Sequence, residues 1–183
     1  MKKLIVLLVP FILLIAGCSQ FDSTPNSPVM TEKSVIQLPH NNSTNVENLF
    51  SVTEDIVGSP GGQIKLNESY ISSNGKVSIK AKLKIPKNAF SGEATLGYQI
   101  NDGEASVDFS PSMNFENNLL FDLKFTGLDL SGIDPNEVQF LYVAPDGSTH
   151  QVQYSEMTVD VDKGILEVKD ALITHFSRYI WGR

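Results

Sequence analysis

The tripeptide His175-Phe176-Ser177, near the end of the chain, carries the residue types that an N→O acyl shift requires. The Ser177 hydroxyl would attack the Phe176 carbonyl carbon while His175 accepts the hydroxyl proton. Water would then hydrolyse the ester and release the segment that begins at Ser177. The alternative is structural: Phe176, Tyr179 and Trp181 pack in a core, and His175 bonds a neighbouring strand. We expect the structural role, because no residue pattern indicates the strained peptide bond that the reaction needs.

The single cysteine, Cys18, follows two lysines and an apolar run from Leu4 to Ala16. This run is shorter than the roughly 20 residues with which a helix crosses a membrane. It ends in Ala16-Gly17, small residues typical of a signal-peptidase site. The pattern resembles the lipobox of bacterial lipoproteins, in which the cysteine thiol receives a diacylglyceryl group. We therefore expect a signal peptide at residues 1–17 and a lipid anchor at Cys18.

Acylated Cys18 would hold the protein on the extracytoplasmic side of a bacterial cell membrane or outer membrane. The alternative is an ordinary secretory signal beside which Cys18 is incidental. The chain has 21 acidic and 14 basic residues, a balance of the wrong sign for general binding to nucleic acid. We expect an unidentified envelope protein as its partner, and no nucleic acid.

The candidate metal ligands in this sequence are carboxylates, since a calcium ion binds six to eight oxygen atoms. Asp129 and Asp134 flank one turn, and Asp160 and Asp162 lead into another. Their spacing matches no EF-hand loop, so we expect no metal site; Asp160 and Asp162 are the weak calcium candidates. No P-loop, GxSxG, HExxH or dinucleotide motif occurs, so we expect no conventional enzyme and no cofactor.

A stripe of lysines could meet an anionic surface such as lipid headgroups or cell-wall polymer; its members are Lys76, Lys80, Lys82, Lys84 and Lys87. The alternative is that outward lysines protect a strand from pairing at a sheet edge, and we expect this simpler role. A carbohydrate binder would present an exposed aromatic platform instead. The available tyrosines are scattered along the sequence: Tyr70, Tyr98, Tyr142 and Tyr154.

Alternation of apolar and polar residues predicts the elements that position these groups. It is clearest over residues 77–85, 119–125 and 157–161. Hairpin signals lie between such runs, namely Ser73-Asn74-Gly75, Asn101-Asp102-Gly103, Pro145-Asp146-Gly147 and Asp162-Lys163-Gly164. We predict eight to ten strands between Gly62 and Trp181. They would form one all-β domain at residues 61–183, an antiparallel β-sandwich.

The segment that follows the expected anchor is rich in Ser, Thr, Asn and Pro. Such a composition buries too little apolar surface to offset the entropy of ordering. We therefore expect a disordered, flexible tether at residues 18–60. Within it, residues 46–57 are mildly apolar and could form a short helix or a strand laid against the domain.

Several short motifs resemble, in their order and spacing, the ZU-five domain of ankyrins and netrin receptors. They are Gly61-Gly62, Ile85-Pro86-Lys87-Asn88-Ala89-Phe90, Phe109-Ser110-Pro111-Ser112, Leu128-Asp129-Leu130-Ser131-Gly132-Ile133-Asp134-Pro135 and His175-Phe176-Ser177-Arg178-Tyr179. The resemblance covers residues 61–183 and implies a β-sandwich used for protein contacts. It also bears on His175-Phe176-Ser177, since some family members cleave themselves between Phe and Ser of such a tripeptide.

Together these observations predict a lipid-anchored, extracytoplasmic interaction or structural module of the bacterial cell envelope that is not a catalyst. The first alternative is a self-processing domain that cleaves once, between Phe176 and Ser177. The second is a binder of cell-surface polymer or carbohydrate.

Overall fold

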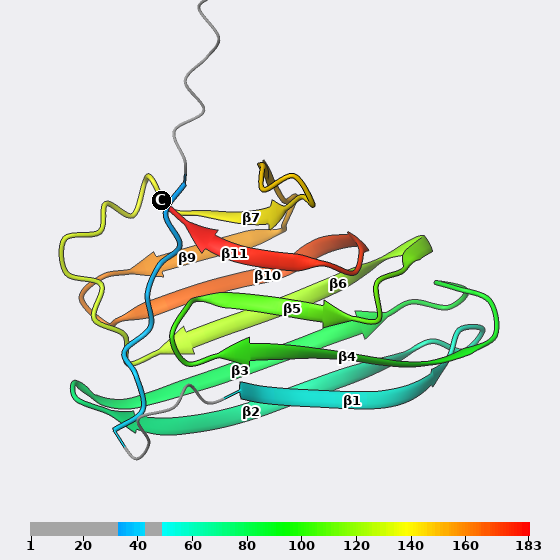
Figure 1. Ribbon diagram of the computed structural model, residues 1–183, viewed down its shortest axis with the longest axis horizontal. Helices are drawn as coiled ribbons and strands as arrows, with labels where there is room; N and C mark the ends of the chain where they lie inside the picture. Colours follow the sequence, from blue (N-terminus) through cyan, green and yellow to red (C-terminus); the bar gives the residue numbers. More distant parts are fainter. Residues whose placement is uncertain (1–32, 43–48) are drawn as a thin grey trace, which may run out of the picture. The chain divides into compact units, whose positions relative to one another are not determined.

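The computed structural model describes residues 33–42 and 49–183, all within one compact unit that spans residues 32–183. The expected signal peptide at residues 1–17 and the expected anchor, Cys18, lie outside the described residues. The described part contains eleven strands and no helix, arranged in two antiparallel sheets (Figure 1). The predicted all-β class and antiparallel sandwich are therefore confirmed.

The strands are β1 (Leu49–Val57), β2 (Gly62–Ser72), β3 (Gly75–Ile85), β4 (Glu93–Asn101), β5 (Ser106–Ser110), β6 (Asn114–Thr126), β7 (Gln139–Val143), β8 (Thr149–Gln151), β9 (Glu156–Asp160), β10 (Ile165–His175) and β11 (Arg178–Gly182). One sheet has six strands in the order β1-β4-β5-β11-β7-β8, and the other has five in the order β2-β3-β6-β10-β9. Ten of the strands follow residue 61, which agrees with the predicted eight to ten.

The predicted alternation places apolar side chains between the sheets. In β3, Val77, Ile79 and Leu83 are completely buried, whereas the intervening lysines face solvent. An aromatic cluster fills the middle of the core: the Phe109 ring lies 4.9 Å from that of Phe121 and 5.0 Å from that of Phe176, between ring centroids. Burial of this apolar surface holds the two sheets together.

All four predicted turns lie between strands. Three of them contain a glycine at positive φ, as expected of tight hairpins: Gly75, Gly147 and Gly164. The backbone also approaches Gly164 closely, so a Cβ there would lie 2.1 Å from the Leu128 carbonyl oxygen. The turn at residues 101–103 reverses differently, because the Gly103 amide donates a hydrogen bond of 2.7 Å to the Asn101 side chain.

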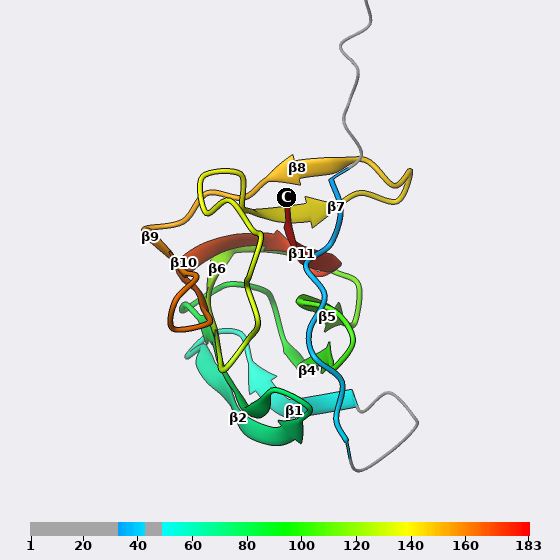
Figure 2. The same cartoon turned by 90° about the vertical axis from the view of Figure 1, so that its left-hand side faces the viewer.

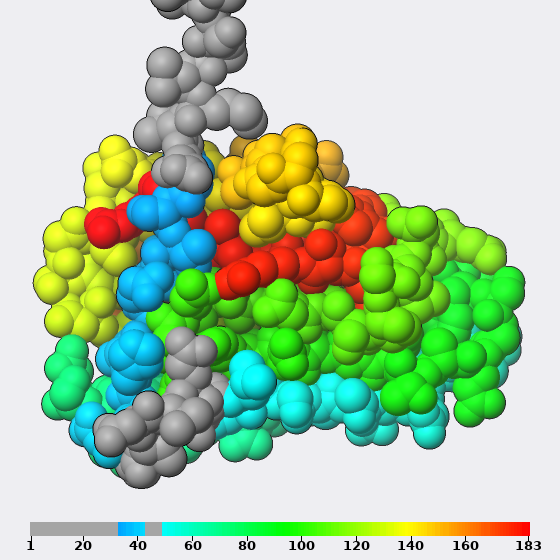
Figure 3. All heavy atoms as spheres, viewed as in Figure 1, coloured from blue at the N-terminus to red at the C-terminus, as the bar shows by residue number. Residues whose placement is uncertain are grey.

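The prediction of a flexible tether up to residue 60 is wrong for its described part. Residues 33–42, here called the N-terminal strap, run along the sandwich (Figures 2 and 3). Ile36 and Leu38 are only 2% and 3% exposed and belong to the core. The segment that was expected to be a short helix or a strand contains β1, which pairs with β4 along its whole length.

The strap is ordered because its backbone completes the end of the sandwich. The Ile36 amide donates to the Trp181 carbonyl at 2.8 Å, and the Ala105 amide donates to the Ile36 carbonyl at 2.8 Å. Ser34 and Arg183 exchange two further bonds of 3.0 and 3.1 Å. Two buried side chains at alternate positions, together with these hydrogen bonds, therefore fix a segment that is mostly polar in composition. The domain begins no later than residue 33.

Candidate functional site

Phe176 and Ser177 form the short connection in which the chain passes from β10, in one sheet, to β11, in the other. Phe176 is 1% exposed, and its ring lies against those of Phe109 and Phe115, with centroids 5.0 and 4.8 Å away. Its amide donates to the Met113 carbonyl at 2.9 Å. This crossing between sheets is therefore held by core packing on the Phe176 side.

The hydroxyl and the imidazole of the tripeptide have separate partners. Ser177 Oγ donates to the Val143 carbonyl at 3.4 Å, whereas Nδ1 of His175 lies 2.8 Å from Thr174 Oγ1. No hydrogen bond joins His175 to Ser177 in the described part of the chain. The expected packing of Phe176, Tyr179 and Trp181 is present, since each is at most 1% exposed. The contacts of all three tripeptide residues thus favour the structural role.

The His175 ring does not bond a neighbouring strand as expected, because it packs instead against aromatic rings. Its centroid is 4.4 Å from that of Tyr142 in an edge-on arrangement. The Tyr179 hydroxyl donates to the His175 carbonyl at 2.9 Å. Burial raises the pKa of Tyr179, with a smaller contribution from Tyr142, so this hydroxyl remains a neutral donor.

A cleft of about 260 Å³ opens between the two sheets beside His175. Tyr142 in β7 and His150 in β8 are cross-strand partners, and their rings are nearly parallel at 6.0 Å between centroids. The rest of the lining combines planar amides, two hydroxyls and apolar groups: Gln151, Val152, Gln153, Leu172, Thr174 and Tyr179. Flat rings beside amide and hydroxyl groups can hold a ligand that is apolar on its faces and polar at its rim.

The sequence pattern points to Tyr142 and to His175 for separate reasons, and it groups neither of them with His150. They meet because the β7–β8 hairpin of one sheet faces β10 of the other, a relation that no local spacing encodes. Of the other tyrosines, Tyr70 and Tyr98 are 5% and 2% exposed. These two therefore belong to the core and provide no aromatic platform at the surface.

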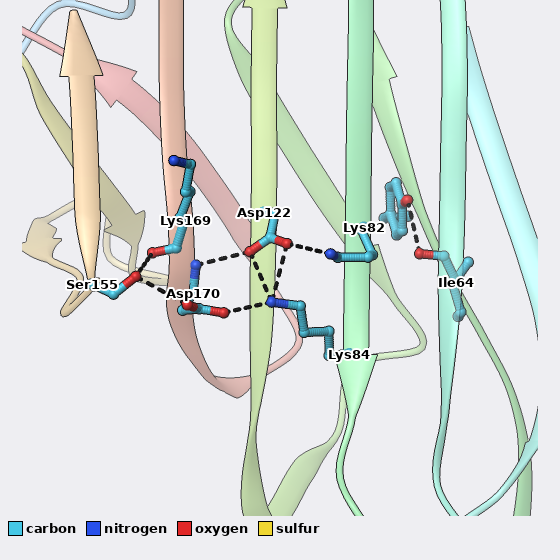
Figure 4. A network of polar contacts seen from close by, with 8 residues as sticks. Ile64, Lys82, Lys84, Asp122, Ser155, Lys169 and Asp170 are labelled. Carbon is cyan, nitrogen blue, oxygen red and sulfur yellow. Dashed lines mark hydrogen bonds and ion pairs between the residues drawn. The ribbon is translucent and has the colours of Figure 1, made fainter.

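The lysine stripe lies on the outer face of the five-stranded sheet, where acidic residues of β6 and β10 neutralise part of it (Figure 4). Lys82 and Lys84 place their amines 2.9 and 3.1 Å from the Asp122 carboxylate, and Lys84 also lies 2.6 Å from Asp170. The expected role, protection of a sheet edge, is wrong because β3 lies between β2 and β6. These lysines pair with neighbouring strands instead.

The ionic network keeps its members charged. Burial opposes ionisation of Asp122, but hydrogen bonds from the Asp170 amide, Lys82 and Lys84 outweigh it and hold the pKa of Asp122 below its ordinary value. The bond from Lys84, followed by that from Ser155, lowers the pKa of Asp170. The bond to Asp170 raises the pKa of Lys84. Each shift moves the pKa of the group further from neutral pH, whereas a general acid or base needs a pKa near the pH at which it works.

A hollow of about 240 Å³ on the same face is lined by Lys65, Lys80 and Lys124 around the ion-paired Asp122 and Glu167. Lys124 bonds Glu167 at 2.9 Å. Among the described residues, Lys65 and Lys80 have no such acidic partner. This surface is thus weakly basic, and it offers two ammonium groups to an anion.

Of the two weak calcium candidates, Asp160 has another partner. Both carboxylate oxygens of Asp160 contact Lys163, one through its amide at 3.0 Å and one through its amine at 2.8 Å. Asp129 and Asp134 accept the amides of Ser131 and Asn136, as in ordinary turns. No group of three His, Cys, Asp or Glu side chains suited to a metal occurs within residues 33–42 and 49–183.

Comparison of the chain with protein-family models, with curated proteins and with solved structures gives no match. Within the described ranges there is no helix long and apolar enough to cross a membrane. The case for a function therefore depends on the sequence pattern at the N-terminus and on the geometry of the sandwich.

Proposed function

We propose that this protein is a lipid-anchored, extracytoplasmic module of the bacterial cell envelope that acts by binding. The observation that carries the proposal is the position of Cys18, directly after Ala16-Gly17 at the end of a short apolar run. The folded unit that follows supports the proposal, because it is a β-sandwich with a continuous apolar core. The resemblance to the ZU-five domain implies that this sandwich makes contacts with other proteins.

The early start of the domain shortens the proposed tether. Only residues 18–32 would separate an anchor at Cys18 from the N-terminal strap, rather than residues 18–60. Even fully extended, that length of chain reaches roughly 50 Å. The sandwich would therefore work close to the membrane that carries it, where a partner is another surface-bound molecule.

The anchor is tested by labelling bacteria that express the full chain with radioactive palmitate. We expect label on the wild-type chain and on the neighbouring control variant Ser19→Ala. The variant Cys18→Ala would lose the label and accumulate as the longer precursor, because the acylated thiol is absent. Label that persists on Cys18→Ala would refute the lipid anchor.

A second function, binding of surface polymer or carbohydrate, is favoured by one specific observation: the cleft that groups Tyr142, His150 and His175. A sugar ring presents C–H groups that pack on aromatic faces and hydroxyls that bond amides. Calorimetric titration with oligosaccharides of cell-wall polymers would show binding that Tyr142→Ala abolishes. The control Ser69→Ala, on the exposed face of β2 in the other sheet, should bind as the wild type does.

A further inference from the structure

Among the strands of residues 33–42 and 49–183, none pairs with the outer side of β1, which forms one edge of the six-stranded sheet. It pairs with β4 without a bulge from Leu49, opposite Asn101, to Val57, opposite Glu93. The strand contains neither Lys nor Pro, the residues that commonly blunt an edge. The opposite edge, β8, has only three residues. A long, regular edge such as β1 is a template for another strand.

The register with β4 shows which backbone groups of β1 point outward. The Gly58 amide donates to the Gly92 carbonyl at 2.8 Å and continues the same register. Hydrogen-bonded pairs alternate in an antiparallel ladder, so the even-numbered residues of β1 bond β4. The odd-numbered residues direct their amides and carbonyls to the free edge. The Val57 carbonyl fits this pattern, since it accepts the Gly61 amide and not a group of β4.

We propose that two copies of this chain associate through β1, antiparallel, with the twofold axis at Thr53. Every outward-pointing residue of β1 then faces another outward-pointing residue, as a hydrogen-bonded ladder requires. Leu49 of each copy faces Val57 of the other, and Ser51 faces Asp55. The two six-stranded sheets become one continuous sheet, and the interface is isologous.

Side-chain exposure and charge select a second copy as the occupant. Leu49 and Val57 are 58% and 45% exposed, and this register brings these two apolar side chains together. The acidic Asp55 meets Ser51, and Glu54 meets Val52, so no like charges lie opposite each other. If the axis lay at residue 54 or 55, the same carboxylate of the two copies would face itself across the interface. If it lay at residue 52, the apolar Leu49 of one copy would face Asp55 of the other.

The experiment is sedimentation equilibrium of residues 32–183, which contain both sheets and their core. We expect a monomer–dimer equilibrium that depends on concentration. Thr53→Pro removes an outward amide but no bond to β4, and should leave only monomer with a retained near-ultraviolet spectrum. The control Thr53→Val keeps the amide and should dimerise. A wild-type chain that remains monomeric at every concentration would overturn the proposal.

Charge variants at Ser51 test the register itself. Ser51→Lys places an ammonium opposite Asp55 at two symmetric positions, and should tighten dimerisation about five-fold. Ser51→Glu places carboxylates opposite each other and should weaken it by a similar factor. Shifts of both variants in the same direction would exclude this pairing. The result is independent of the anchor, because the measured unit lacks Cys18.

Discussion

Leu38 in the N-terminal strap provides a direct test of where the domain begins. The side chain is 3% exposed and belongs to the core, although its segment reads as a polar tether. Leu38→Ala removes buried methyl and methylene groups and leaves a cavity, while the amide of residue 38 can still donate to the Gly103 carbonyl at 3.1 Å. The change therefore probes packing and leaves the strap's hydrogen bonds in place.

The expected loss follows from burial. Replacement of a fully buried leucine by alanine costs about 2–5 kcal/mol, and a site near the end of a sandwich can partly collapse, so we expect about 2–3 kcal/mol. For a domain of this size each kcal/mol lowers the melting temperature by roughly 2–4 °C. Ile71→Ala is the matched control, because Ile71 in β2 is 56% exposed and its truncation should cost less than about 0.5 kcal/mol.

The assay is urea unfolding of residues 32–183, followed by tyrosine and tryptophan fluorescence. A lower midpoint for Leu38→Ala with an unchanged slope would show loss of stability within the same fold. Equal midpoints for Leu38→Ala, Ile71→Ala and the wild type would refute the inclusion of the strap in the core.

Other predictions follow from individual contacts. The pKa values of Asp122 and Asp170 are lowered in the folded state, so their contribution to stability is complete above the ordinary value of 3.8 and is lost as pH falls through the folded values. The free energy of unfolding, measured over this acid range, should therefore fall with pH. Asp122→Asn should make this dependence on pH less steep. Gly164→Ala should cost at least 2 kcal/mol in thermal melts, more than the control Gly147→Ala, whose Cβ meets nothing within 4 Å. Phe176→Ala should cost about 3–5 kcal/mol in urea unfolding, whereas Ser177→Ala, which loses one long hydrogen bond, should cost below about 1 kcal/mol; similar losses for both would contradict the packing described for this crossing.

The strands after residue 61 could be predicted because their information is local. The alternation in β3 appears in a short window of sequence, and so do the glycine turns between β7 and β8 and between β9 and β10. The strap could not be predicted in this way. Ile36 and Leu38 are only two buried residues in a mostly polar segment, and the order of that segment depends on hydrogen bonds with Trp181 and Ala105, far away in the sequence.

The cleft shows the same limit for the candidate site. Tyr142 and His150 are near enough in sequence to suggest a hairpin, but His175 joins them only through packing of one sheet on the other. The role of the lysine stripe also depends on the strand order. Since β3 is an interior strand, its lysines do not protect a sheet edge. Local patterns identified the residues, whereas the strand order determined their partners.

Lipid anchoring and the integrity of the Phe176–Ser177 bond can be measured together, as the intact mass of the full chain extracted from the membranes of an expressing bacterium. A lipid-anchored binding module predicts one species that begins at diacylglyceryl-modified Cys18 and ends at Arg183. A chain that ends at Phe176, with a separate piece from Ser177, would show self-processing instead. An unmodified Cys18 would contradict the proposed anchor.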